Sequence, residues 1–258
     1  MTIMIKQIIV CLLAGMGAGL GTGFAGMSAA AVISPMLITF LDIPAYQAVG
    51  IALASDVLAS LVSANTYRKN GNLDIRNGVI MMVSVLLLTM VGSYASSMVP
   101  NQTMGSFSVV MTLLMGIKFI VKPVMTTKET MMDVPKMKRT VQSIIWGSAV
   151  GFICGFVGAG GGLMMLLVLT SVLGYELKTA VGTSVFIMTF TALTGALSHF
   201  AIDGMPDMVT LLLCSVFTLL WARIAARLAN KAEASILNRA TGAILVVLGI
   251  VILGVNYL

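Results

Sequence analysis

The sequence predicts an all-α polytopic membrane protein built from two inverted repeats of five segments, in which the first helix of each half is broken or re-entrant. The composition is the first indication, because 59% of the residues are hydrophobic and only 9% are charged, against about 25% charged in soluble domains. Long, continuously apolar runs reach the roughly 20 residues that a membrane-spanning helix needs, and they do not alternate as barrel strands do. A glycine pattern that recurs at one constant offset is the third indication.

Ten apolar segments follow one another along the chain. They lie at about 3–23, 27–41, 46–67, 77–98 and 104–122, and then at 141–157, 160–173, 179–199, 207–228 and 236–256. The first has only Lys6 before it and no cleavage site, so we expect a retained segment and not a signal peptide. Segments 27–41 and 160–173 reach only roughly 22 Å as helix, which is short for a bilayer. Each is predicted to be the second arm of a broken pair.

The two halves repeat at an offset of 132 positions. The aligned pairs are Gly15 and Gly147, Gly19 and Gly151, Gly23 and Gly155, Gly26 and Gly158, Phe24 and Phe156, and the triplets 48–50 and 180–182. Later segments align after a one-residue insertion, as with Gly71 and Gly204. Internal repeats of this kind are typical of transporter folds. The predicted organisation is a first membrane repeat over 1–123, a cytoplasmic linker over 124–139 and a second membrane repeat over 140–258.

The charges of the loops indicate how the repeats are oriented. Loop 68–76 has three basic residues and one acid, whereas its counterpart 199–207 has two acids and no Lys or Arg. The linker 122–139 and the stretch 223–239 are basic. Basic loops remain in the cytoplasm, so 68–76, 122–139 and 229–235 are predicted inside, and 99–103 and 200–206 outside. Corresponding loops then lie on opposite sides, which makes the repeats inverted and both termini periplasmic.

The stretches GFAGMSAAA (23–31) and GFVGAGGGL (155–163) interrupt the apolar runs. Tight helix packing is a sufficient account of Gly15, Gly19, Gly147 and Gly151. Three consecutive glycines at 160–162 suit the start of a helix whose backbone N–H groups face a cavity. A helix N-terminus attracts anions, and two such ends related by inverted symmetry would converge near the midplane. The predicted substrate-binding residues are Gly26, Met27, Ser28, Ala29, Gly158, Ala159, Gly160, Gly161, Gly162, Thr183 and Ser184.

The two halves differ at the positions of Thr183 and Ser184. The matching positions are Ile51 and Ala52, which carry no hydroxyl. A pocket with one polar wall would suit an asymmetric ligand that is polar at one end.

The broken glycine motif, Pro35-Met36-Leu37, the Ala-x-Gly-Thr-Ser run at 180–184 and YRKNGNLD (67–74) together resemble the sulfite exporter TauE/SafE family. The resemblance covers nearly the whole chain. It implies a secondary transporter, an exporter of small sulfur-containing anions such as sulfite, thiosulfate or organosulfonates across the bacterial inner membrane. One departure bears on the substrate: the first half has Gly26-Met27-Ser28 where the second has Gly158-Ala159-Gly160.

Three ionisable residues are candidates for coupling or gating. Asp56 lies in the middle of an apolar segment, where an acid is costly and often functional, and it could carry a proton that balances the anion. The alternative is an aspartate held by hydroxyls such as Ser55 or Ser60, or by a basic residue. His199, at the end of a helix, could sense pH or be an interfacial histidine. Arg223 could anchor its helix or attract anions to a cytoplasmic vestibule.

Two other functions remain open at this point. An anion channel would need the same polar path as a transporter. A membrane-embedded enzyme is less favoured, since one histidine and one acid in mid-membrane give no nucleophile–base pair or metal motif. The cysteines Cys11, Cys154 and Cys214 have no metal-like spacing. We therefore expect no cofactor, no metal and no nucleic acid. The expected partners are a small anion and the lipid bilayer, and a homodimer is left open.

Overall fold

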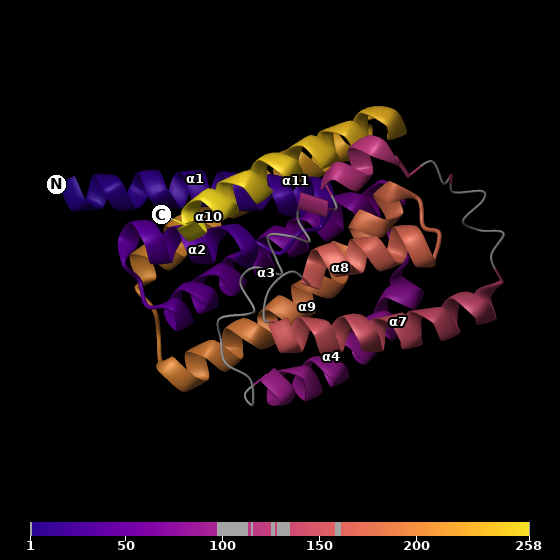
Figure 1. The fold of residues 1–258 in the computed structure, drawn as a ribbon, viewed down its shortest axis with the longest axis horizontal. Coiled ribbons are helices and arrows are strands. Elements are labelled where there is room, and N and C mark those ends of the chain that lie inside the picture. The colour runs from indigo at the N-terminus through magenta and orange to yellow at the C-terminus, as the bar shows by residue number, and fades with distance from the viewer. Residues whose placement is uncertain are drawn as a thin grey trace.

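The structure is a computed structural model that describes residues 2–96, 113–114, 116–124, 127, 135–157 and 161–257. Its regular elements in this part of the chain are all helices, which lie beside one another along the long axis of the molecule (Figure 1). They are α1 (Thr2–Ala25), α2 (Ala30–Leu41), α3 (Ala45–Lys69), α4 (Ile75–Ser96), α7 (Lys136–Val157), α8 (Gly161–Leu167), η2 (Val168–Val172), α9 (Leu177–Asp203), α10 (Met208–Lys231) and α11 (Ala234–Tyr257).

Nine of the predicted segments coincide with helices of the described residues, and of the fifth, 104–122, the structure describes residues 113–114 and 116–122. The helices long and apolar enough to cross a membrane within the described ranges are five: Met4–Ala25, Gln47–Lys69, Leu177–Ala201, Met208–Lys231 and Ala234–Val255. The second segment of each half is shorter. Helix α2 has 12 residues, which is about 18 Å of helix against a hydrocarbon core of about 30 Å. Helix α8 has 7 residues and continues directly into the π-helical turn η2.

The duplication in the sequence is also visible in the helix packing. An offset of 132 places α1, α2 and α3 on α7, the α8–η2 pair and α9. The most extensive helix contacts exchange partners between the halves, because α1 packs on α10 whereas α7 packs on α4. Helices α3 and α9, which correspond to each other, pack together at the centre. The described helices therefore share one duplicated plan, and the inverted orientation of the halves in a membrane stays a prediction.

Close packing of α1 on α10 explains the first glycines of the motif. A β-carbon at Gly19 would lie 2.6 Å from the Thr218 carbonyl oxygen, which is nearer than real β-carbons come. At the corresponding place in the second half, a β-carbon at Gly151 would collide with the carbonyl oxygen of Val85 in α4. The packing account of these glycines is confirmed.

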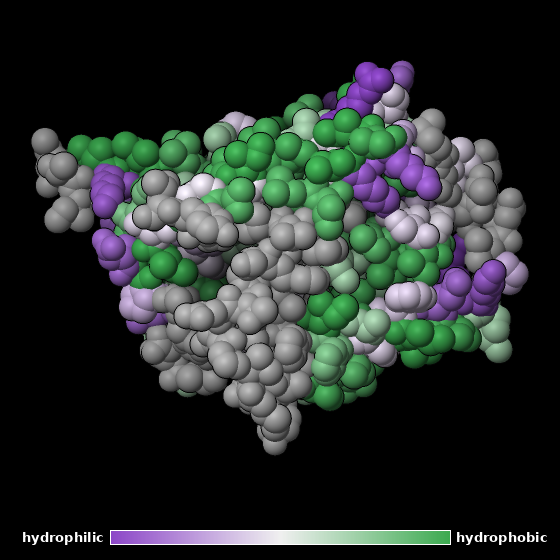
Figure 2. All heavy atoms as spheres, in the orientation of Figure 1, coloured by the Kyte–Doolittle hydropathy of each residue, from purple (hydrophilic) through white to green (hydrophobic). Residues whose placement is uncertain are grey.

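Polar residues mark two ends of the bundle. Helix α10 has 24 residues and is therefore about 36 Å long. Near its start, Gln7 Nε2 donates to Asp207 Oδ2 at 2.9 Å, and near its end Asn72 Nδ2 donates to Asn230 Oδ1 at 2.6 Å. We call the region at the start of α10 the Asp207 end. We call the region at the end of α10 the Asp74 end, after the residue just before α4. Figure 2 shows hydrophilic residues gathered at the left and right of the view, with hydrophobic atoms between them.

Both termini of the described chain lie at the Asp207 end (Figure 1). Gln7 in α1 bonds Asp207, and Thr39 Oγ1 near the end of α2 donates to the Val255 carbonyl oxygen in α11 at 3.3 Å. The structure thus agrees with the prediction that the two termini share a side. The membrane face on which they lie stays a prediction.

Candidate functional site

The first glycine break satisfies its own backbone. Helix α1 ends before Gly26, whose φ of +62° is a left-handed conformation that glycine adopts without strain. The N–H of Met27 donates to the Gly21 carbonyl oxygen at 3.2 Å, and Thr22 Oγ1 donates to the Met27 carbonyl oxygen at 2.9 Å. Irregular backbone inside a membrane protein requires such partners. The break is therefore a built feature of this chain.

The two breaks lie against each other. A β-carbon at Gly162 in α8 would collide with the Gly26 carbonyl oxygen and would lie 3.0 Å from the Ser28 nitrogen. Ser184 in α9 is fully buried, and its Oγ lies 3.3 Å from the carbonyl oxygens of both Gly26 and Gly162. One serine hydroxyl thus joins the two glycine motifs, which are far apart in the sequence.

A carboxylate of the protein itself lies at the start of α2. Asp56 in α3 is fully buried. Its Oδ2 accepts from Ser28 Oγ and its Oδ1 from Ser60 Oγ, each at 2.9 Å, and the backbone of Ala29 adds a further hydrogen bond. These described partners are hydroxyl and amide donors, and none of them is a cation. Asp56 therefore lies where helix geometry would favour an anion.

The structure brings together some of the predicted residues and separates others. Met27, Ser28, Ala29, Gly162 and Ser184 are all buried around the two breaks. Gly161, half-buried, begins α8 beside them, whereas Gly158, Ala159 and Gly160 lie outside the described residues.

Thr183 does not face the breaks. Its Oγ1 accepts a hydrogen bond from the backbone N–H of Asp74 at 3.2 Å, so it belongs to a different cluster. Of the two hydroxyls proposed to hold Asp56, Ser60 does so, whereas Ser55 Oγ donates to the Ile51 carbonyl oxygen at 2.9 Å and lies 3.3 Å from Ser215 Oγ. Ser28 was expected to contact substrate, and in the structure it is the second serine that donates a hydrogen bond to Asp56.

The other two ionisable candidates lie apart from this group. His199, near the end of α9, has its Nδ1 2.9 Å from the carbonyl oxygen of Gly195, one turn earlier in the same helix. Arg223 is exposed on α10.

The sequence reasoning did not single out a polar cluster at the Asp74 end. Tyr175 Oη donates to Asp74 Oδ2 at 2.8 Å, Asn77 Nδ2 donates to the same oxygen at 2.7 Å, and Arg139 Nη1 lies 3.7 Å from it. The Arg139 guanidinium also lies 5.4 Å from the centre of the Tyr175 ring. Burial raises the pKa of Tyr175 above its usual value, which keeps the hydroxyl protonated and able to donate.

The internal repeat was a signal that could have found this cluster. Asp74 matches Asp207 once the one-residue insertion is applied, and each stands immediately before a helix. At the Asp207 end, Thr210 and Gln7 donate to the matching carboxylate. In this chain, an acid that the repeat places before a helix in both halves therefore indicates a polar cluster.

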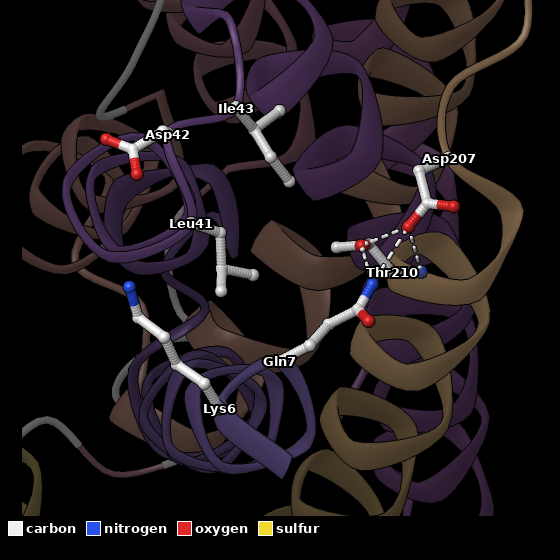
Figure 3. A pocket seen from close by; sticks show the side chains of 7 residues that line it. All are labelled: Lys6, Gln7, Leu41, Asp42, Ile43, Asp207 and Thr210. Carbon is white, nitrogen blue, oxygen red and sulfur yellow. Dashed lines mark hydrogen bonds between the residues drawn. The ribbon is translucent and has the colours of Figure 1, made fainter. Parts of the chain in front are cut away.

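A pocket of about 420 Å³ opens at the Asp207 end. Figure 3 shows Lys6 extending from α1 towards Asp42, while Gln7 turns the other way towards Asp207 and Thr210. The lining is completed by Leu41 at the end of α2 and by Ile43 in the connection between α2 and α3. Within the described ranges, no three His, Cys, Asp or Glu side chains lie close enough to hold a metal ion.

Comparison with known proteins agrees with a membrane transporter. A probable membrane transporter protein of Bacillus subtilis (strain 168), YdhB, is 22% identical over 222 residues, covering 86% of this chain and 90% of that protein. A second from the same organism, YunE, is 25% identical over 194 residues, 70% and 71% of the two chains. A third, from Haemophilus influenzae (strain ATCC 51907 / DSM 11121 / KW20 / Rd), is 26% identical over 208 residues, 78% and 76% of the chains.

No solved structure matches the chain. Residues 11–252 match the family described as sulfite exporter TauE/SafE. That range includes both glycine breaks, Asp56 and the helix pairs on which the duplicated plan rests. The chain belongs to the sulfite exporter TauE/SafE family of membrane transporters.

Proposed function

We propose that this protein is a secondary transporter, an exporter of small sulfur-containing anions such as sulfite, thiosulfate or organosulfonates, in the bacterial inner membrane. The family match supports the class of substrate. The observation that carries the site is the meeting of the two glycine breaks beside Asp56, which gathers backbone amides, two serine hydroxyls and one carboxylate at the start of α2.

In this proposal the Asp56 carboxylate occupies the place that the substrate anion takes. Ser28 Oγ and the Ala29 backbone both contact Asp56, and both would be suitable donors for a sulfonate or sulfite oxygen. If both the Asp56 carboxylate and the substrate anion accepted from these donors, the two negative charges would repel each other strongly in a site of low dielectric. Substrate binding therefore requires Asp56 to be protonated or to move away.

Protonation of Asp56 would couple the anion to a proton. A neutral carboxylic acid can still accept from Ser60 and donate its proton to a neighbouring oxygen. The Ser28 hydroxyl would then be available to the anion. Proton and anion would bind together and leave together, so their combined charge would be smaller than that of the anion alone.

The test is exchange of a labelled sulfonate by purified protein in proteoliposomes, with a pH gradient imposed. Saturable exchange that an inward or outward proton gradient drives would support the proposal. The matched variants are Ser28→Ala, which removes a donor shared with the substrate, and Ser55→Ala, which removes a buried hydroxyl that does not contact Asp56. We expect Ser28→Ala to weaken exchange and Ser55→Ala to leave it nearly unchanged.

The same preparation separates a transporter from an anion channel. Flux that does not saturate with substrate, accompanied by a large single-channel current, would favour a channel. Absence of exchange with sulfite, thiosulfate and a panel of organosulfonates would contradict the proposed substrate class.

A further inference from the structure

The Asp74 cluster and the pocket at the Asp207 end occupy corresponding positions in the two halves. At an offset of 132, Arg139 matches Gln7 and Tyr175 matches Ile43. After the one-residue insertion, Asp74 matches Asp207 and Asn77 matches Thr210. Four positions at one end of the bundle thus have their counterparts at the other end, about the length of α10 away.

At the Asp74 end, side chains from separate elements contact one another. Asp74 precedes α4, Arg139 belongs to α7, and Tyr175 lies in the connection from η2 to α9. The side chains of Arg139 and Asp74 are 10% and 16% exposed, so this ion pair is largely withdrawn from solvent. The backbone N–H of Asp74 is bonded to Thr183 in α9 as well. These contacts tie the connection that follows the short helix of the second half to α4 and α7.

At the Asp207 end the carboxylate keeps its contacts with α1 and α10, but the counterpart of Tyr175 is separated from it by the pocket. Asp207 is bonded to α1 through Gln7 Nε2 at 2.9 Å and to Thr210 in its own helix. Ile43 takes the place of Tyr175 and offers no hydroxyl. The connection that follows the short helix of the first half is separated from α10 by the 420 Å³ pocket, as Figure 3 shows.

We infer that these two clusters are the two gates of the transport path, and that the structure has the Asp74 gate closed and the Asp207 gate open. Opening of the Asp74 gate would move Tyr175 away from Asp74. Closure of the Asp207 gate would bring Ile43 towards Thr210. The pocket lining carries one ammonium and two carboxylates, Lys6 against Asp42 and Asp207. This excess of negative charge disfavours the holding of an anion in the pocket.

This inference rests on the proposed transport function but requires no knowledge of the substrate. The experiment measures closure at the Asp207 end after a change at the Asp74 end. Ile43→Cys and Thr210→Cys are introduced together across the pocket, with Cys11, Cys154 and Cys214 replaced by serine. Their cross-linking by a short thiol-reactive linker is followed in proteoliposomes without substrate.

Arg139→Gln copies the residue of the open end into the closed end. It should raise the cross-linking rate at the Asp207 end by about tenfold, which lies between the small effect of losing an exposed ion pair and the larger effect of breaking a buried one. Tyr175→Phe, which removes one hydroxyl, should act in the same direction and keeps the test decisive if Arg139→Gln does not fold. Arg139→Lys should restore most of the original rate. Asn70→Ala, which loses a hydrogen bond within α3 at the same end, is the matched control and should change nothing.

A second measurement follows the opening of the Asp74 gate itself. Ser143 is 1% exposed and matches Cys11 by the repeat. A Ser143→Cys reporter should be labelled faster by a soluble maleimide in Arg139→Gln than in the parent protein. Faster labelling with an unchanged rate of cross-linking at the Asp207 end would overturn coupled gates, and unchanged labelling would overturn the Asp74 gate itself. Coupled cross-linking without any sulfonate exchange would keep the gates and contradict the proposed substrate.

Discussion

Replacing Asp56 with asparagine tests the proposed competition between the carboxylate and the substrate. Ser28 Oγ lies 2.9 Å from Asp56 Oδ2. An anion oxygen bonded at the same distance to that hydroxyl could lie no more than about 5.8 Å from Oδ2, where two unit charges at an effective dielectric of 20 repel by about 3 kcal/mol. That repulsion corresponds to about a hundredfold difference in affinity between ionised and neutral Asp56.

The binding of a sulfonate should therefore weaken as the pH rises, by up to tenfold per pH unit, until the hundredfold difference is exhausted. A sulfonate stays singly charged across this range, so the substrate does not titrate. Asp56→Asn keeps the shape and has no charge, and its affinity should equal that of the protonated protein at every pH. Isothermal titration calorimetry from pH 5.5 to 8.5 measures both proteins.

The matched control is His199→Gln, because His199 is the only histidine in the chain and histidine is the side chain type that most often acts as a pH switch in proteins. It should leave the pH dependence intact. A pH dependence that survives in Asp56→Asn would refute the reasoning, and one that disappears in His199→Gln would transfer the role to the histidine.

Three further outcomes are expected from the packing and the hydrogen bonds. Gly19→Leu should destabilise the protein by at least about 1–3 kcal/mol in thermal unfolding, since its side chain would strike α10, whereas Gly254→Ala, with open space around it, should be neutral or slightly stabilising. Asn238→Ala should cost about 1–3 kcal/mol and speed proteolysis between the halves, because buried Asn238 bonds both the N–H and the carbonyl of Val124. Hydrogen bonding, first from the Thr210 hydroxyl, lowers the pKa of Asp207, so its ionised form adds stability above the usual carboxyl pKa and loses it as the pH falls through the lowered value. Asp207→Ala should accordingly lower the melting temperature at pH 7, and the difference should shrink below about pH 4; an equal difference at both pH values would contradict this account.

The sequence is sufficient for the helices and the breaks because both depend on local composition. The short second segments follow from run length, and they are α2 and the α8–η2 pair in the structure. The close approach of Gly19 to α10 follows from the spacing of small residues on one helix face. Even the residues that end α1 could be anticipated, since Gly26 supplies a positive φ that other residues avoid.

The sequence was not sufficient to predict the side-chain contacts between helices. Thr183 and Ser184 are adjacent, so they point about 100° apart on a helix, and only Ser184 faces the breaks whereas Thr183 faces Asp74. Asp56 and Ser28 are 28 residues apart on different helices. No local pattern specifies which donor an acid in mid-helix will meet, because that choice depends on the rotation of α3 against α2.

The duplicated plan carries different chemistry in its two halves. The carboxylate of Asp56 has Met188 as its counterpart, so only one half can offer a titrating group at its break. The second half instead has the Arg139 and Tyr175 pair where the first has Gln7 and Ile43. If both ends carried the charged cluster, opening either would cost the same, and two symmetrical states would be equally populated without substrate. An ion pair at one end alone favours the state closed there. Asp56 lies at the first glycine break, whereas the ion pair of Arg139 and Asp74 lies at the Asp74 end. Asp56→Asn therefore tests the site, and Arg139→Gln tests the gate.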